Sequence, residues 1–296
     1  MRLLIAGWQG QLARCLVGSA LRRGDVEACA AGRPALDLCE LPTIQRNLAD
    51  VEPDVVINTA AYTDVDRAER ESERAYALNR DGAAMLAEAA ASRGVPIIHI
   101  SSDYVFDGRR AGAYAEHHPT APLSVYGASK LAGEEAVAKA NPAHLIIRTA
   151  WVHSPLGKNF VTRMLAQAGE HAEIAVVADR RGSPTFAPHL AEVVLALAAR
   201  IAADGCAPTA GVYHAAGRGS ASWYEFAETI FAASKVHGGP QPALRAIRSP
   251  DYPTEAARPQ NAALDMSHME QTFGLTLPDW RLGARQCVAE LMAQPD

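Results

Sequence analysis

The sequence lacks the features of a membrane-spanning, disulfide-stabilised or zinc-binding chain. Its longest apolar run, residues 193–199, is far shorter than the roughly 18 residues that span a bilayer. Only residues 3–6 form an apolar run before Gly7, too short for a signal-peptide core. The five cysteines are odd in number and none is spaced as CxxC. We therefore expect no disulfide framework and expect the protein to work in a reducing cytoplasm.

Strong charge of one sign is also absent. Charged residues make up 21% of the 296 residues, the net charge is −5, and no block of lysine or arginine occurs. We therefore expect neither nucleic acid nor a membrane as a partner. Apolar residues, at 49%, suffice for a large core, and the length suggests one or two domains.

The first half alternates short apolar runs with longer helical patterns. Strands are expected at 3–6, 26–31, 55–57, 95–100 and 145–147, and helices at 11–23, 83–93 and 128–140. Continuous apolar strands that alternate with helices indicate a parallel sheet covered on both faces. The prediction is an α/β fold with a doubly wound, Rossmann-like parallel sheet.

After residue 150 the pattern loosens. Clusters of glycine, proline and polar residues separate helical patterns at 159–168, 188–203 and 223–233. We expect residues 1–150 to form a dinucleotide-binding domain, with returning segments near 188–216. Residues 151–296 should form mainly a smaller, loop-rich lobe for the substrate.

The first predicted strand leads into a glycine-rich turn. Gly7, Gly10 and Ala13 are spaced as G-x-x-G-x-x-A, and this segment opens the first predicted helix. Such a turn brings a phosphate to the amides at the positive end of a helix. Many such turns bind nothing, but the place of this one after the first strand favours a dinucleotide.

The end of the second predicted strand bears on the choice of cofactor. Enzymes that use NAD usually have an acidic residue there, which holds the ribose hydroxyls. This sequence has Arg33 instead, which could hold a 2′-phosphate or simply face solvent. NADPH is therefore favoured, and NADH stays possible. Asp37 and Leu38 could flank the adenine.

Tyr126 and Lys130 are the main candidates for chemistry. They stand four residues apart in a predicted helix, so they share a face. An ammonium group beside a phenol lowers the pKa of the phenol toward neutrality. Ser102 follows the strand predicted at 95–100, and parallel strands end at the ligand crevice. Its hydroxyl should face both the phenol and a substrate carbonyl.

With these features the chain resembles the extended short-chain dehydrogenase/reductases over nearly its whole length. The resemblance is carried by the segments Gly7–Ala13, Asn58–Asp66, Ser101–Gly108, Tyr126–Glu134, Arg148–Val152, Gly157–Phe160, Gly182–Thr185, Gly211–His214, Ser222–Trp223, Arg258–Asn261 and Leu264–Asp265. It implies a reductase that transfers hydride from NADPH, or NADH, to the C4 keto group of a dTDP-linked sugar.

The resemblance also implies roles for single residues. Tyr126 would donate the proton, Lys130 would bind the nicotinamide ribose and tune the phenol, and Ser102 would bind the carbonyl oxygen. The cofactor would lie against Gly7, Gly10, Gln11, Leu12, Arg33, Asp37, Leu38, Ala61, Tyr62, Thr63, Tyr126 and Lys130. The substrate would lie against Val65, Ser102, Asp103, Tyr104, Trp151, Asn159, Phe160, Thr185 and Arg258.

No metal is expected. Some members of the family bind magnesium through acidic residues, but the matching positions here hold Cys15 and Pro188. The histidines also lack the spacing of metal ligands. A dimer that depends on a metal is therefore disfavoured, and the chain could be a monomer or a homodimer.

Two other functions stay open. An epimerase or reductase of a different nucleotide sugar would share these features, and so would a non-catalytic, nucleotide-binding regulatory subunit. Intact Ser102, Tyr126 and Lys130 disfavour the second. A dehydratase is disfavoured too, because Tyr104 stands where elimination would need a second carboxylate after Asp103. The charged segment 64–70 is expected to be a solvated helix face.

Overall fold

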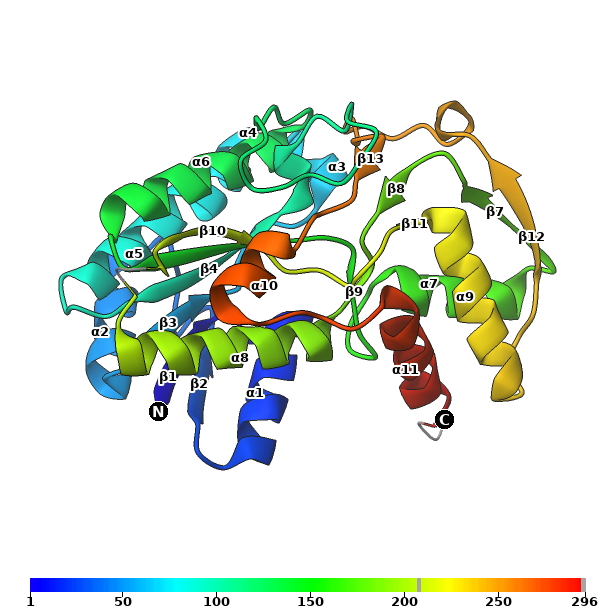
Figure 1. Cartoon of the computed structure of the whole chain (residues 1–296). Coiled ribbons are helices and arrows are strands. Elements are labelled where there is room, and N and C mark those ends of the chain that lie inside the picture. Colours follow the sequence, from blue (N-terminus) through cyan, green and yellow to red (C-terminus); the bar gives the residue numbers. More distant parts are fainter. Residues whose placement is uncertain (207–208, 294–296) are drawn as a thin grey trace.

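A computed structural model describes residues 1–206 and 209–293 of the chain. Residues 207–208, in the expected returning segment, and 294–296, in the expected lobe, therefore lie outside the described residues. Figure 1 shows a larger part built around a sheet and, beside it, a smaller part that contains α7, α9, α11, β7 and β12. No helix among the described residues is long and apolar enough to cross a membrane.

The larger part is organised around six parallel strands in the order β10-β5-β4-β3-β1-β2. Their bounds are β1 (Arg2–Ala6), β2 (Glu27–Ala31), β3 (Val55–Asn58), β4 (Ile97–Ser102), β5 (His144–Thr149) and β10 (Gly211–His214). The five apolar runs of the first half form the first five of these strands. The predicted doubly wound parallel sheet is thus confirmed.

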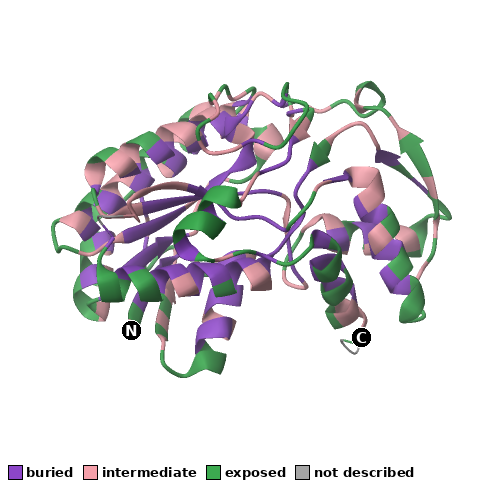
Figure 2. Ribbon diagram, viewed as in Figure 1, coloured by how far each residue is buried: buried purple, intermediate pink, exposed green. Residues whose placement is uncertain are grey.

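Helices cover both faces of this sheet (Figure 1). Successive strand residues point to opposite faces, so Leu3 and Ile5 pack with α1 and α8, whereas Leu4 packs with α2, α5 and α6. Figure 2 shows buried residues along the strands and on the inner sides of these helices. The helices of this part are α1 (Gln11–Arg23), α2 (Leu41–Val51), α3 (Val65–Ala68), α4 (Ser72–Tyr76), the π-helical turn η1 (Ala77–Gly82), α5 (Ala83–Ala91), the 3₁₀ turn η2 (Asp103–Val105), α6 (Val125–Ala140), α8 (Ala187–Asp204) and α10 (Ser267–Phe273).

The smaller part has a core of its own, in which Phe226, Ile230 and Trp280 are buried. Its helices are α7 (Phe160–Glu170), α9 (Trp223–Val236) and α11 (Trp280–Met292), with the 3₁₀ turn η4 (Ser249–Asp251). Short strands complete it and connect it to the larger part: β6 (Val152–His153), β7 (Glu173–Val177), β8 (Arg181–Gly182), β9 (Thr185–Phe186), β11 (Ala221–Ser222), β12 (Ala243–Ile247) and β13 (Asn261–Ala262).

Candidate active site

The glycine-rich turn leaves the N-terminus of α1 open. Gly7 has a φ of +99°, and a Cβ atom there would lie 2.8 Å from Thr59 Oγ1, so the position requires glycine. A Cβ atom on Gly10, the N-cap of α1, would meet nothing within 4 Å, and no side chain of the described residues caps the helix. The first amides of α1 can therefore bind an anion such as the diphosphate of a dinucleotide.

The side chains of Gln11 and Leu12 serve the fold. Leu12 lies in the core, and the Gln11 amide nitrogen donates to Val152 O at 3.3 Å. Gln11 Oε1 accepts bonds from Ser154 Oγ at 2.9 Å and Asn159 Nδ2 at 3.2 Å. Only the backbone amides of Gln11 and Leu12 are left for a diphosphate, while the Gln11 side chain ties the turn to the smaller part.

At the end of β2, Arg33 is exposed and Trp8 covers Gly32. A Cβ atom on Gly32 would lie 2.2 Å from Trp8 Cδ1. Asp37 is half-buried, but Leu38 is 2% exposed and lies in the core. The predicted packing of the Leu38 side chain on an adenine is therefore not supported, because that side chain faces the core.

Asn79, in η1, holds the segment that follows β3. Its amide nitrogen donates to Tyr62 O at 3.1 Å and to Ser129 Oγ at 2.9 Å, and its oxygen accepts from Tyr62 N at 2.7 Å. Asn79 thereby connects Tyr62, the middle one of the predicted cofactor contacts Ala61, Tyr62 and Thr63, to α6. Sequence analysis missed Asn79, since nothing in its neighbours indicates a buried amide.

Ser102 ends β4, and its hydroxyl contacts the next two residues. Ser102 Oγ donates to Asp103 Oδ1 at 2.9 Å and accepts from Tyr104 N at 3.2 Å. Asp103 is 2% exposed, and burial raises the pKa of its carboxyl to about 7, against the bond from Ser102. Asp103 Oδ2 is buried without a hydrogen-bond partner among the described residues. A sugar hydroxyl could donate to this oxygen.

Tyr126 lies in the first turn of α6, beside the same residues. Its ring packs edge-on against Tyr104, with the centroids 5.5 Å apart. Gly127 permits this approach, because a Cβ atom there would lie 2.2 Å from Tyr104 O. Burial raises the pKa of the Tyr126 phenol above its usual value. The Ser102 hydroxyl lowers that pKa, and the charges of Asp103 and Tyr104 raise it.

Lys130 lies one helical turn further on and is 2% exposed. Its Nζ donates to Ile100 O at 2.7 Å and lies 3.5 Å from His99 Nε2. Burial lowers the pKa of Lys130 to about 8, although Glu134 opposes the shift. The predicted lowering of the Tyr126 pKa is wrong for this structure. Burial dominates at the phenol, and the Lys130 amine donates to Ile100 O of β4.

His99 links Lys130 to the end of β3. Ala60 N donates to Asn58 Oδ1, so the Asn58 amide nitrogen is the donor to His99 Nδ1, 3.1 Å away. Burial holds the pKa of His99 well below its usual value, and the Lys130 charge acts in the same direction. The neutral ring therefore carries its proton on Nε2, which faces Lys130. Sequence analysis did not predict that His99 connects Lys130 to Asn58.

Trp151 forms an aromatic wall toward the smaller part. Its indole stacks on Trp223, with centroids 3.5 Å apart and planes at 8°. Phe160 packs against Trp223 at 4.6 Å. The backbone of Trp151 has a φ of +45°, a left-handed conformation that is strained outside glycine. The indole is half-buried, with Trp223 stacked on it and Gly182 in close contact with it.

The side chains of Asn159 and Thr185 are engaged in hydrogen bonds within the fold. Asn159 caps α7 through Val161 N. Thr185 is fully buried, and its hydroxyl donates to Ser183 O at 3.0 Å and accepts from Gly217 N at 3.2 Å. The substrate contacts predicted for these two residues are not supported by this geometry.

Arg258, predicted to contact the substrate, is bound to α3. Its two terminal nitrogens donate to the Asp66 carboxylate at 2.9 and 2.7 Å. Arg70 pairs with Glu255 at 2.9 Å. The predicted solvated face at 64–70 is therefore wrong at Asp66, because residues 255–258 pack over it. Val65 is half-buried at the start of α3.

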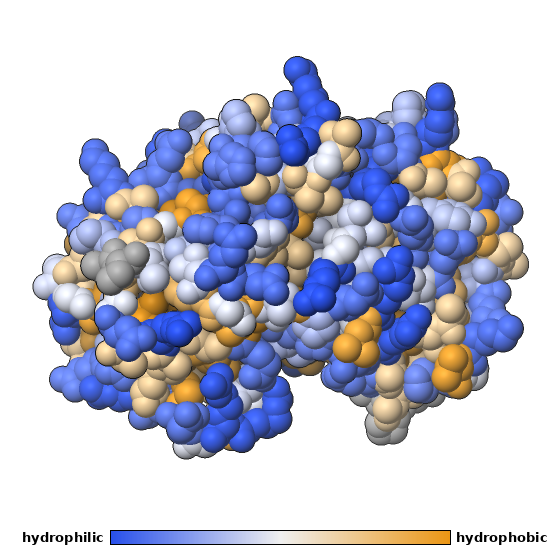
Figure 3. Space-filling model, in the orientation of Figure 1, coloured by the Kyte–Doolittle hydropathy of each residue, from blue (hydrophilic) through white to orange (hydrophobic). Residues whose placement is uncertain are grey.

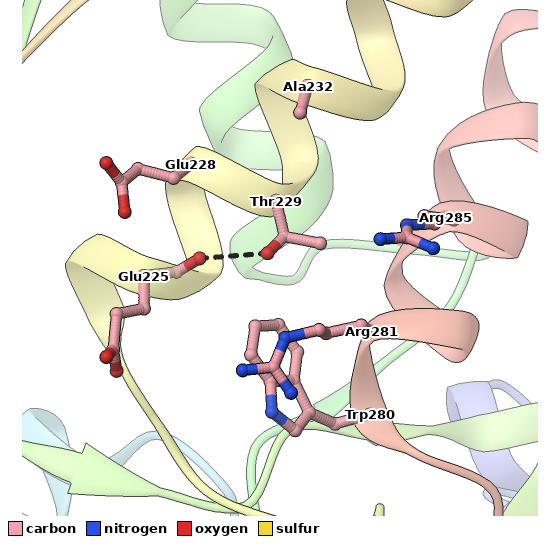
Figure 4. A pocket seen from close by; sticks show the side chains of 7 residues that line it. All are labelled: Glu225, Glu228, Thr229, Ala232, Trp280, Arg281 and Arg285. Carbon is pink, nitrogen blue, oxygen red and sulfur yellow. Dashed lines mark hydrogen bonds between the residues drawn. The ribbon is translucent and has the colours of Figure 1, made fainter.

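On the face shown in Figure 3, the surface is largely hydrophilic, with hydrophobic side chains in small separate spots. Two surface cavities share no residue with the predicted site. One, of about 390 Å³, includes Glu116 and His117. The other, of about 310 Å³, lies between α9 and α11, where Arg281 covers the Trp280 ring (Figure 4).

Comparison with known proteins gives consistent matches over nearly the whole chain. A family model described as the RmlD substrate binding domain matches residues 1–293. A dTDP-4-dehydrorhamnose reductase of Sinorhizobium fredii is 45% identical over 294 residues, which cover 99% of each chain.

Two solved structures agree in fold as well as in sequence. A dTDP-4-dehydrorhamnose reductase of Clostridium acetobutylicum has a TM-score of 0.90 and 34% identity, covering 98% of this chain and 99% of its own. The Bacillus anthracis enzyme of the same name, in complex with NADP, has a TM-score of 0.90 and 33% identity with the same coverage.

Proposed function

The chain belongs to the family of dTDP-4-dehydrorhamnose reductases, and on that premise we propose that it reduces the C4 keto group of dTDP-4-dehydro-L-rhamnose to give dTDP-L-rhamnose. NADPH is the proposed cofactor, with NADH as a possible substitute. The NADP in the Bacillus anthracis relative and the exposed Arg33 at the end of β2 support this choice. The observation that carries the proposal is the group of Ser102, Asp103 and Tyr126 where β4 ends.

The residues of this group divide the work on the substrate carbonyl. NADPH, when bound on the amides of α1, supplies the hydride. The Ser102 hydroxyl donates a hydrogen bond to the oxygen on which negative charge grows, and Tyr126 gives it a proton. A raised pKa keeps the Tyr126 phenol protonated until the more basic alkoxide oxygen forms and takes the proton. Lys130 binds the nicotinamide ribose, and Asp103 Oδ2 accepts a bond from a sugar hydroxyl.

We also propose that the two parts of the chain bind different ligands. Residues 1–150, with the returning segments 188–216, bind the dinucleotide and contribute Ser102 and Asp103 to the sugar site, and the rest of 151–296 forms mainly the lobe for the nucleotide sugar. The packing of α8 on α1 and of β10 on β5 supports this. The proposed setting is the cytoplasm, as a monomer or homodimer, with the product used for cell-surface polysaccharide.

The test is oxidation of NADPH by the purified protein with dTDP-4-dehydro-L-rhamnose. Tyr126→Phe should lower kcat by about 10²- to 10⁴-fold, because it removes the proton donor. The affinity for NADPH, measured by fluorescence titration, should stay within about twofold. Absence of turnover in the unmodified protein would refute the function, and full turnover in Tyr126→Phe would refute the role of the phenol.

A further inference from the structure

A second guanidinium group lies near Arg258, and none of the roles above accounts for it. Arg180 is half-buried and directly precedes β8. Its Nε is buried and has no hydrogen-bond partner in the described part of the chain. Leaving a buried donor of a charged group unpaired is costly, so such a group in a folded protein calls for an explanation.

Nearby carboxylates are already engaged by other groups. Arg258 and Asp66 bind each other through two hydrogen bonds. Asp179, next to Arg180 in the chain, accepts from Ser249 N at 2.9 Å and from Ser249 Oγ at 2.6 Å. Burial lowers the pKa of Arg180, and the charge of Arg258 adds to this, whereas Asp179 opposes it. Two guanidinium groups so placed favour an anion as a further partner.

Arg180 also lies at the border of the proposed sugar site. Gly182, two residues further on, touches the Trp151 indole, since a Cβ atom there would lie 2.3 Å from Trp151 Cε2. Burial raises the pKa of Tyr104 to about 12, while Arg258 and Arg180 lower it. The Tyr104 ring in turn packs on Tyr126. The two guanidinium groups therefore lie one side chain away from the proposed proton donor.

We propose that Arg180, beside Arg258, binds the diphosphate that joins the sugar to its nucleoside. The proposal rests on the proposed function and assigns a further residue to it. In a hexose, C1 lies across the ring from C4. When C4 faces Tyr126, the diphosphate on C1 is carried past Tyr104, toward the guanidinium groups. The planar fork of an arginine, which includes Nε–H, matches phosphate oxygens in a bidentate manner.

The test compares Arg180→Ala with Arg181→Ala. Arg181 is a matched control, because it is the next residue, its side chain is 45% exposed and it pairs with Glu225 at 3.2 Å. Arg180→Ala should raise the Kd for dTDP and the KM for the sugar nucleotide by about tenfold to a hundredfold. Its Kd values for thymidine and NADPH should change less than about twofold. Arg181→Ala should leave all four constants nearly unchanged.

Two further variants keep the proposal open to refutation if Arg180→Ala folds poorly. Arg180→Gln retains a long polar side chain without the charge and should still lose dTDP affinity, whereas Arg180→Lys should recover part of it. Unchanged affinity for dTDP in a folded Arg180→Gln protein would overturn the proposal. Titration with dTDP requires no turnover, so this result is independent of any failure of the proposed reaction.

Discussion

At the scale of single residues, Asp103 is a proposed sugar contact whose ionisation in a buried place lowers the stability of the fold. Burial raises the pKa of its carboxyl from 3.8 to about 7. Because the folded pKa is the higher one, the folded protein keeps a proton that the unfolded chain releases between these two values. The contribution of Asp103 to stability is therefore full below about pH 4 and is lost as the pH rises through about 7.

Asp103→Asn should remove this pH dependence. The amide cannot ionise, so the variant should be more stable than the parent at pH 8, by at most about 4 kcal/mol, and nearly equal to it at acidic pH. Thermal unfolding at pH 4 and pH 8 measures the difference. Asp50→Asn, on the exposed side of α2, is the control. An equal gain at both pH values would contradict the assignment of the cost to ionisation of Asp103.

Part of the residue-scale arrangement was predictable from the sequence, and the chemical roles of these residues stay predictions. Ser102 and Tyr126 stand in motifs whose spacing implies their roles, and the structure places them side by side. His99 was missed, because its partners Asn58 and Lys130 come from elements remote in the sequence. The error at Lys130 has the same origin. Helical spacing predicts which face a side chain shares, but not that a carbonyl of β4 binds its amine.

At the scale of elements, the strand β8 supports the stack of Trp151 on Trp223. Gly182→Ala would place a Cβ atom 2.3 Å from Trp151 Cε2 and push the indole out of position. The KM for the sugar nucleotide should rise by about tenfold or more, since a displacement near 1 Å at a positioning contact is costly. The KM for NADPH should not change, because the turn before α1 is untouched. Steady-state kinetics with each substrate varied in turn checks both.

A second glycine provides the comparison for this prediction. Gly169 lies in α7, where a Cβ atom would meet nothing within 4 Å. Gly169→Ala should leave both KM values unchanged and stabilise the protein by about 0.5–1 kcal/mol. If Gly182→Ala behaved in the same way, the indole would not be held by this close approach.

Regular elements were predictable from the sequence where local pattern dominates. The helix predicted at 11–23 is observed with the same bounds, and the predicted strands begin or end within two residues of their observed bounds. The two-residue strands β6, β8, β9, β11 and β13 were not predicted, because a pair of residues has no periodicity. Helices α2 and α11 were missed as well. The predicted solvated face at 64–70 failed because a segment 190 residues further along covers Asp66.

At the scale of the whole molecule, independence from a metal ion remains a prediction. Within the described ranges, no three His, Cys, Asp or Glu side chains are grouped so that they could hold a metal ion. Dialysis against EDTA should therefore leave kcat and the oligomeric state unchanged. Light scattering and turnover before and after dialysis measure both. A loss of either that added magnesium restores would contradict the prediction.

The overall plan of the molecule followed from the alternation of apolar runs and helical patterns. That alternation predicts a parallel sheet covered on both faces, but it says nothing about how the later segments return. The strand β10 joins β5 at the edge of the sheet, and segment 255–258 lies over α3. Sequence analysis expected segments near 188–216 to return, but neither the pairing of β10 with β5 nor the contact of segment 255–258 with α3, because both depend on residues far apart in the chain.

The amide of Gln11 makes the two halves of the molecule difficult to exchange independently. It forms hydrogen bonds with Val152, Ser154 and Asn159 from the first residue of α1, next to the turn that should bind the dinucleotide. A chimaera with its first 150 residues from one relative and the remainder from another would keep these hydrogen bonds only if both parents carried compatible side chains.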